Sequence, residues 1–282
     1  MLKSAMESLL RRPLLGRVVL NPAAAPAAGE PTAVAEALQR GVLGAIASFT
    51  RADGRLDYAA LRASAAWGEA AARAGALQSV SLGDLSGRPA RLAFWINVYN
   101  AMVFHGIVAL GIRRTVWEMR GFFARVAYRV GGFTLTADDV EHGILRGNAA
   151  HGFLRRRPFG GRDPRLALAV HPVDPRIHFA ITCGAQSCPP VGAYRAAALD
   201  QQLDLAARNF LNQEVAVDAR GCVTCSRILE WYAGDFASAG GVGAFMTRYL
   251  DAGPVRDAVA ARARPCDEFR PYDWSLQHEP AE

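Results

Sequence analysis

The feature that most constrains the fold of this chain is a long helix that is apolar on nearly every side. Residues 93–112, AFWINVYNAMVFHGIVALGI, carry large apolar side chains in almost every direction around a helix with 3.6 residues per turn. The exception is one polar stripe that contains Asn97, Asn100 and His105. A helix that is apolar all round is stable only when other elements surround it. We therefore expect this helix at the centre of the core.

The polar stripe on a buried helix needs partners inside the protein. A buried amide or imidazole without a hydrogen bond costs about 1–3 kcal/mol. One interpretation is structural: the two asparagines bind loop backbone, and His105 is a satisfied core histidine. The other is that the stripe forms the back wall of a polar site.

Hydrophobic periodicity and turn residues predict the other elements of the chain. The expected elements are helices over 32–51, 56–75 (capped at Asp57), 85–112, 137–146 (capped at Thr136) and 194–213, short helices within 228–263, hairpins over 125–135 and 215–225, strands over 163–170 and 174–181, and a terminal extended segment over 266–276. This order does not alternate strand and helix as a parallel α/β sheet requires. It predicts a helix-rich α+β domain over 32–278, with a small, mostly antiparallel sheet packed on the buried central helix.

The two ends of the chain are predicted to lie outside this domain. Residues 1–31 read as a short amphipathic segment followed by a Pro/Ala-rich linker from residue 21, and residues 279–282 as a tail. Glu7, Arg11 and Arg12 interrupt any apolar export signal, and no stretch reaches the roughly 18 uninterrupted apolar residues that a membrane span requires. We expect a cytoplasmic protein without a membrane span.

The basic charge of the chain is dispersed. The formal net charge is +6, and all basic residues except Lys3 are arginines spread along the whole sequence. No aromatic-interleaved basic stripe or nucleic-acid reader motif accompanies them, so we expect no nucleic-acid partner. The expected partner is a small-molecule or peptide substrate, and the sequence identifies neither a protein partner nor a cofactor.

The segment DPRIHFAITCGAQSCPP, residues 174–190, concentrates the residues that could carry chemistry. Read as a strand, it places Ile177, Phe179 and Ile181 on one face and His178, Ala180 and Thr182 on the other. Gly184 then allows backbone N–H groups to turn inward. A cysteine beside such amides and a histidine is how a thiol is activated. Cys183 is the first candidate nucleophile, and Cys188 is the second.

The cysteines permit two further interpretations. Cys183 and Cys188 could form a disulfide, although a reducing compartment disfavours it. Together with Cys222 and Cys225 they would also give the pattern C-x4-C…C-x2-C, with the second pair on a hairpin as in a zinc knuckle. Inert, buried thiols are the structural alternative.

The short helix 137–146 supplies the remaining polar candidates. Asp138, Glu141 and His142 can share one face. The acids can simply offset the helix dipole. Alternatively, Glu141 orients a histidine, or His142 is itself a base.

Six segments in order resemble the family known as domain of unknown function 547. They are FWINVYNAMVFHGI, DDVEHGILR, DPRIHFAITCGAQSCPPV, LDLAARNFLN, ILEWYAGDF and YDWSL, and the resemblance covers roughly residues 48–277. It implies that the shared positions matter, which here are Trp95, Asn97, Tyr99, Asn100, His105, Glu141, His142, Arg176, His178, Cys183, Gly184, Ser187 and Pro189. Relatives more often have leucine at Cys225, which argues against a zinc site common to the family. Relatives are also often exported.

Two functions follow as hypotheses. In the first, a cysteine-dependent hydrolase or acyl/amide transferase, Cys183 attacks a carbonyl, and His178 or His105 takes its proton. Glu141 or Asn97 would orient the imidazole, and turn amides near Gly184 would hold the oxyanion. A buried helix packed on a histidine-bearing strand resembles papain- and transglutaminase-like enzymes by analogy.

The second hypothesis is a non-catalytic module. Its polar pocket would bind a peptide or small anion through Arg176 and the histidines. The positions expected to line the site in either case are Tyr99, Asn100, His142, Arg176, Gly184, Ser187 and Cys188.

Overall fold

The helix predicted to be buried is the centre of the structure. The computed structural model describes residues 16–150 and 156–277, and in it helix α5 (Gly87–Ala109) is buried at every position from Leu92 to Val108. Within those described ranges, α5 is also the one helix whose length and hydropathy would allow it to cross a membrane, and 94% of its most apolar stretch is covered by the protein. Such burial is typical of a core helix.

The structure is built from helices and two small sheets, which confirms the predicted helix-rich α+β class. The helices are α2 (Pro31–Phe49), α3 (Tyr58–Ala63), α4 (Ala65–Ala72), α6 (Phe122–Arg125), α7 (Leu199–Glu214), α8 (Arg227–Trp231), α9 (Val242–Tyr249) and α10 (Pro254–Ala260). The strands are β1 (Val18–Val19), β2 (Val126–Val130), β3 (Phe133–Thr136), β4 (Ala216–Val217), β5 (Val223–Cys225) and β6 (Glu268–Phe269).

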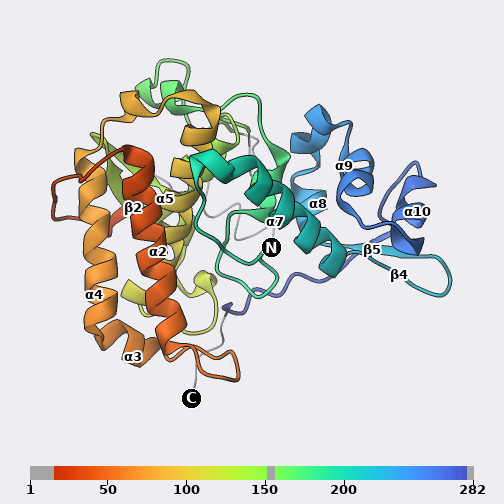
Figure 1. Cartoon of the computed structure of the whole chain (residues 1–282), viewed down its shortest axis with the longest axis horizontal. Coiled ribbons are helices and arrows are strands. Elements are labelled where there is room, and N and C mark those ends of the chain that lie inside the picture. Colours follow the sequence, from red (N-terminus) through yellow and green to blue (C-terminus); the bar gives the residue numbers. More distant parts are fainter. Residues whose placement is uncertain (1–15, 151–155, 278–282) are drawn as a thin grey trace.

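Both sheets are mixed. In each, an antiparallel hairpin (β2–β3 or β4–β5) carries one parallel edge strand, β1 on β2 and β6 on β5. The two hairpins are those that the turn residues predicted. The first sheet packs on α5 through β2, and the second lies at the other end of the molecule (Figure 1).

The apolar interior has two parts, and both α7 and the short segment after residue 174 contribute to each of them. The larger part surrounds α5 and includes α2, α4 and β2, whereas the smaller part is formed by α7 to α10 and β5. Figure 1 shows α2, α3, α4 and α5 on one side, α8, α9 and α10 on the other, and α7 between them. In the segment after residue 174, Ile177 and Ala180 pack in the first part and Phe179 in the second. His178 therefore lies at the junction.

The two predicted strands over 163–170 and 174–181 are wrong: both segments form 3₁₀ helices, Pro164–Leu168 and Pro175–Phe179. Each begins with Asp-Pro-Arg. The aspartate side chain accepts the backbone N–H of the arginine two residues later, and proline occupies the first helical position. This local capping outweighs the alternation of apolar residues that suggested strands.

Two predicted helices are altered locally. The helix expected over 56–75 is broken at Ser64, whose hydroxyl accepts the N–H of Trp67 and starts α4. The helix expected over 137–146 begins at the predicted Thr136 cap, where Thr136 and Asp139 exchange side-chain-to-backbone hydrogen bonds. Its residues Asp139–Leu145 form a π-helix, a form that is rare and often found at functional sites.

The structure describes only part of the two segments that were predicted to lie outside the domain. The predicted amphipathic segment lies mostly in residues 1–15, and the predicted tail in 279–282, which are outside the described residues. At the start of the predicted linker, Asn21 is buried and bonds the backbone of Ala74 and Arg129.

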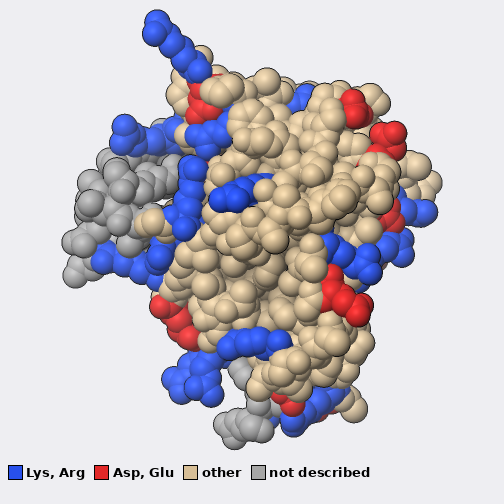
Figure 2. Space-filling view, turned by 90° about the vertical axis from the view of Figure 1, so that its left-hand side faces the viewer, with Lys and Arg blue, Asp and Glu red and all other residues tan. Residues whose placement is uncertain are grey.

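Figure 2 shows the face on the left of Figure 1, where basic side chains lie mostly toward the edges, with acidic ones between them.

Candidate functional site

The turn over residues 180–188 is positioned by α5. The side chain of Asn100 donates to the carbonyl of Ala180 at 2.8 Å and accepts the N–H of Thr182 at 3.0 Å. Gly184 follows in the left-handed region, with φ of 81°, and a Cβ there would approach Cδ1 of Ile107 to 2.4 Å. Only glycine fits at this point, because any side chain would meet both backbone strain and the surface of α5.

Two sulfur atoms meet one tyrosine hydroxyl at this turn. The hydroxyl of Tyr272 lies 3.2 Å from Sγ of Cys183 and 3.1 Å from Sγ of Cys188, and the backbone N–H of Cys183 donates to Sγ of Cys188 at 3.0 Å. Cys183 is half-buried, and Cys188 is 8% exposed. We call these three side chains the thiol cluster.

The thiol cluster favours one thiolate, at Cys188. Burial raises the pKa of Cys188, but hydrogen bonds from Cys183, Tyr272 and Thr182 outweigh it and lower that pKa to about 6. Burial and the neighbouring Cys188 sulfur raise the pKa of Cys183 well above its usual value. Burial and both sulfurs also raise the pKa of Tyr272, which therefore keeps its proton and can donate it. A negative charge on Cys188 is thus surrounded by donors, as a stable thiolate requires.

A second polar group lies beside the thiol cluster and is centred on Glu141 of the π-helix. Its carboxylate accepts hydrogen bonds from Tyr99 of α5 at 2.8 Å and from Tyr232, after α8, at 2.7 Å. Burial raises the pKa of both tyrosines, and the negative charge of Glu141 raises it further. Both hydroxyls therefore remain protonated.

A third group fixes His178. Its Nε2 lies 2.9 Å from the carboxylate of Asp235, which also binds Arg146 through two hydrogen bonds. Burial and the positive charge of Arg146 lower the pKa of His178, although Asp235 opposes them. Because a carboxylate only accepts, the neutral ring carries its proton on Nε2, and the buried Nδ1 has no hydrogen-bond partner. The ring also stacks on Tyr232, with centroids 3.9 Å apart.

The structure does not bring His105 to the thiols. Val103 and Ile107 face Gly184 across the turn, and His105, two residues from each, points to the opposite side of α5. There its Nδ1 lies 2.9 Å from the hydroxyl of Tyr128, and its ring meets Trp67 edge-on. Burial lowers the pKa of His105 to about 4. It is placed as a satisfied core histidine rather than as a base for Cys183.

The two asparagines of the polar stripe, Asn97 and Asn100, form hydrogen bonds with backbone groups of other segments. Asn97 exchanges two hydrogen bonds with the main chain of Tyr194, at 2.8 and 2.9 Å. This amide therefore anchors the loop before α7 and does not orient an imidazole. Asn100, as described, braces the turn itself.

Arg176 is paired with acidic side chains. Its guanidinium binds the carboxylates of Asp174, Asp200 and Asp204, each at 2.8 Å. The binding role expected for Arg176 stays a prediction, and an anion there would compete with these three acids. His142 is a similar case, because its Nδ1 lies 2.9 Å from Arg146 and 3.7 Å from Glu141.

The backbone N–H groups of Cys183 and Gly184 already donate hydrogen bonds within the protein. They therefore do not form the oxyanion pocket that was predicted near Gly184. The N–H of Gly184 donates to the Thr182 hydroxyl at 3.0 Å, and that of Cys183 donates to sulfur. Ser187 instead ties the turn to the end of the chain: its hydroxyl accepts the N–H of Asp273 at 2.9 Å. This contact holds Tyr272 against the two cysteines.

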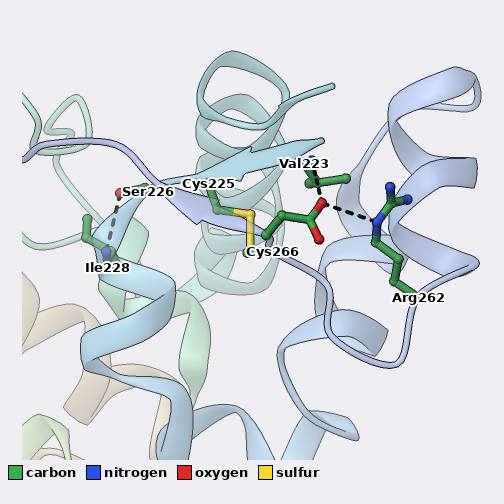
Figure 3. The surroundings of a disulfide bond; sticks show 7 residues. Val223, Cys225, Ser226, Ile228, Arg262 and Cys266 are labelled. Atoms are coloured by element: carbon green, nitrogen blue, oxygen red, sulfur yellow. Dashed lines mark hydrogen bonds and ion pairs between the residues drawn. A yellow bond between two sulfur atoms is a disulfide. The ribbon is translucent and has the colours of Figure 1, made fainter. Parts of the chain in front are cut away.

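The four-cysteine zinc hypothesis is wrong, because Cys225 is not free. Cys225 and Cys266 form a disulfide that joins β5 to the segment leading into β6 (Figure 3). Beside it, the Asp267 carboxylate accepts the N–H of Val223 at 2.7 Å and pairs with Arg262 at 3.4 Å. Among residues 16–150 and 156–277, no group of three or more His, Cys, Asp or Glu side chains could hold a metal ion.

Sequence reasoning missed four of the polar side chains that meet here. They are Arg146, Tyr232, Asp235 and Tyr272. Three of them lie in ILEWYAGDF and YDWSL, segments that contributed to the family resemblance without being assigned a role. Tyr272 is 84 residues from Cys188 in the chain, so no spacing rule could pair them.

Tyr272 also lines an open groove. The groove measures about 270 Å³, and its wall includes Ser187, Glu214, Ser226, Arg227, Arg270 and Asp273. Its polar and charged wall suits a polar ligand that contacts Tyr272.

Comparison with known proteins gives one match. Residues 82–211 match the family model described as "Protein of unknown function, DUF547". The match runs from just before α5 into α7 and includes both cysteines of the cluster, whereas Tyr232, Asp235 and Tyr272 lie beyond it. No curated protein and no solved structure matches the chain, so the likeness to papain- and transglutaminase-like folds stays a prediction.

Proposed function

We propose that the DUF547 domain that this chain carries over residues 82–211 belongs to a thiol-dependent hydrolase or acyl transferase, with Cys183 as nucleophile and Cys188 as its base. The observation that carries this proposal is the pair of sulfurs on one tyrosine hydroxyl. It gives a half-buried thiol a neighbouring thiolate that can take its proton, which is how a thiol becomes a nucleophile.

The proton balance is simple. Cys183 transfers its proton to Cys188, directly or through the Tyr272 hydroxyl, and its sulfur forms a bond to the substrate carbonyl carbon. The carbonyl electron pair moves to oxygen. When it returns, the bond to the leaving group breaks, and the Cys188 thiol supplies the proton that the leaving group needs. The thioester left on Cys183 is then transferred to water or to another acceptor.

In this proposal His178 has a positioning role. Its imidazole, fixed by Asp235 and stacked on Tyr232, supports the tyrosine that binds Glu141. The base expected from the histidines is supplied by the second sulfur instead.

Acylation by 4-nitrophenyl acetate tests the proposal. We expect an acetyl group on Cys183, located by peptide mass mapping, that is absent in Cys183→Ser. In Cys188→Ser, acetylation should require a higher pH, because the internal base is gone. The matched control is Cys222→Ser, which removes the third free cysteine, outside the cluster, and should behave as wild type.

Two results would overturn the proposal. One is a wild-type protein in which no cysteine of the cluster is acetylated at neutral pH. The other is acetylation at Cys183 with the same pH dependence in wild type and Cys188→Ser. Either result would favour the non-catalytic binding module.

A further inference from the structure

Four aromatic side chains form a continuous surface beside the thiol cluster. The ring centroid of Trp274 lies 4.6 Å from that of Tyr272, 4.8 Å from that of Trp117 and 5.9 Å from that of Trp231. Trp231 also contacts Tyr272, at 4.9 Å. These spacings are those of rings in direct contact. We call Trp117, Trp231, Tyr272 and Trp274 the aromatic shelf.

The aromatic shelf is open to solvent. Trp117 is 42% exposed and Trp231 is 37% exposed. Among residues 16–150 and 156–277, the one other large apolar side chain with comparable exposure is Leu205 of α7, at 58%. Both exposed tryptophans pack on Trp274, and contiguous exposed apolar surface of this kind marks binding sites.

The shelf is held rigidly by three separate parts of the chain. Trp117 belongs to a 3₁₀ helix, Val116–Glu118, and Trp231 ends α8. The segment with Tyr272 and Trp274 is fixed between them, because the N–H of Leu276 donates to Arg114 at 2.8 Å. The same segment pairs with the cysteine turn through Ser187. The rings are therefore preorganised relative to the sulfurs.

Tyr272 connects the shelf to the chemistry. Its ring is part of the shelf, and its hydroxyl bonds both sulfurs. Any flat group lying on Trp231 and Trp274 is one tyrosine ring away from Cys183. The polar groove, which Tyr272 also lines, leaves room for the polar part of the same molecule.

We infer that the aromatic shelf binds a flat aromatic ring in the acyl part of the substrate and so delivers the carbonyl to Cys183. The inference rests on the proposed function. The substrate class it names is an ester, thioester or amide whose acyl group carries an aromatic ring next to polar, peptide-like groups. Ring stacking on tryptophan supplies the preference, and the groove accepts the polar remainder.

The test compares two activated esters that differ only in the side chain of the acyl group. They are the 4-nitrophenyl esters of N-acetylphenylalanine and N-acetylalanine, and the readout is the ratio of their acylation rates at Cys183. We expect wild type to prefer the phenylalanine ester by about tenfold, the effect of one or two aromatic contacts. Trp231→Ala should bring the ratio close to one. Leu205→Ala, which removes an exposed apolar side chain outside the shelf, should keep the wild-type ratio.

The possible failures are distinguishable. A wild-type ratio near one, with Cys183 still acylated by both esters, overturns this inference and leaves the proposed function standing. If neither ester acylates Cys183, the proposed function fails. The shelf is then judged by tryptophan fluorescence during titration with N-acetylphenylalaninamide. Quenching in wild type that Trp231→Ala abolishes supports a ring-binding shelf, and unchanged fluorescence overturns it.

Discussion

Replacing Tyr272 by phenylalanine should move the first ionisation of the thiol cluster by one to two pH units. The change keeps the ring and removes the hydroxyl that bonds both sulfurs. A hydrogen bond to a charged group contributes about 1.5–3 kcal/mol, and one pKa unit corresponds to about 1.4 kcal/mol. The pKa of Cys188, held at about 6, should therefore rise to roughly 7–8. At pH 7 the thiolate would fall from about nine tenths of the molecules to between a half and a tenth.

The assay is thiolate absorbance in the ultraviolet against pH, measured in a Cys222→Ser background so that only the cluster titrates. Because the two sulfurs are coupled, the first apparent pKa belongs to the pair. Tyr249→Phe is the matched control, since it removes a hydroxyl that bonds the carboxylate of Asp204 rather than a sulfur. Identical titration curves for wild type and Tyr272→Phe would refute the reasoning, as would an equal shift in the control.

Three further predictions concern stability. Gly184→Ala should destabilise the protein more than Gly132→Ala, because both glycines have positive φ but only the first collides with α5; equal changes in urea midpoint would contradict this. The double variant Cys225→Ser/Cys266→Ser should lose about 4 kcal/mol, as expected for a cross-link over 41 residues, a loss of roughly 7 °C in Tm; a scan in wild type with and without reductant is the control. Burial lowers the pKa of His105 from 6.5 to about 4, so between these pH values the unfolded chain binds a proton that the folded protein excludes. Stability should fall by up to about 3 kcal/mol on acidification through that window, and His105→Gln should flatten the profile in urea titrations.

The sequence predicted the centre of the fold because the central helix leaves no alternative. A helix with apolar side chains all round can only be buried, and its asparagines can only bind backbone or a ligand. The structure realises the structural interpretation at Asn97 and His105. At Asn100 the amide also holds backbone, here the turn that carries Cys183, and the role of the stripe as the wall of a polar site stays a prediction.

The failed strand predictions have a local cause. Alternation of apolar residues over 174–181 is a correct observation, but Asp174 caps the chain and Arg176 folds back onto it. Side-chain-to-backbone hydrogen bonds over two residues compete directly with a sheet ladder. The same Asp-Pro-Arg sequence at Asp163 gives the same 3₁₀ helix, so the repeated motif was the informative signal and the periodicity was not.

The thiol cluster could not be predicted, because its parts come from distant points in the chain. Because His178 is close to Cys183 in sequence, the sequence suggested a dyad in which the imidazole lies beside the thiol and takes its proton. The structure separates these roles: Asp235 fixes the ring of His178, burial and the charge of Arg146 lower its pKa, and a second sulfur provides the negative charge. A site of this kind needs no histidine to form its thiolate, so its reactivity should depend on the contact between the turn and the C-terminal segment. Asp273 directly follows Tyr272, so a change that breaks the hydrogen bond between Ser187 and Asp273 should move the Tyr272 hydroxyl away from both sulfurs. This contact therefore links the position of residues 272 and 273 to the chemistry proposed for the turn.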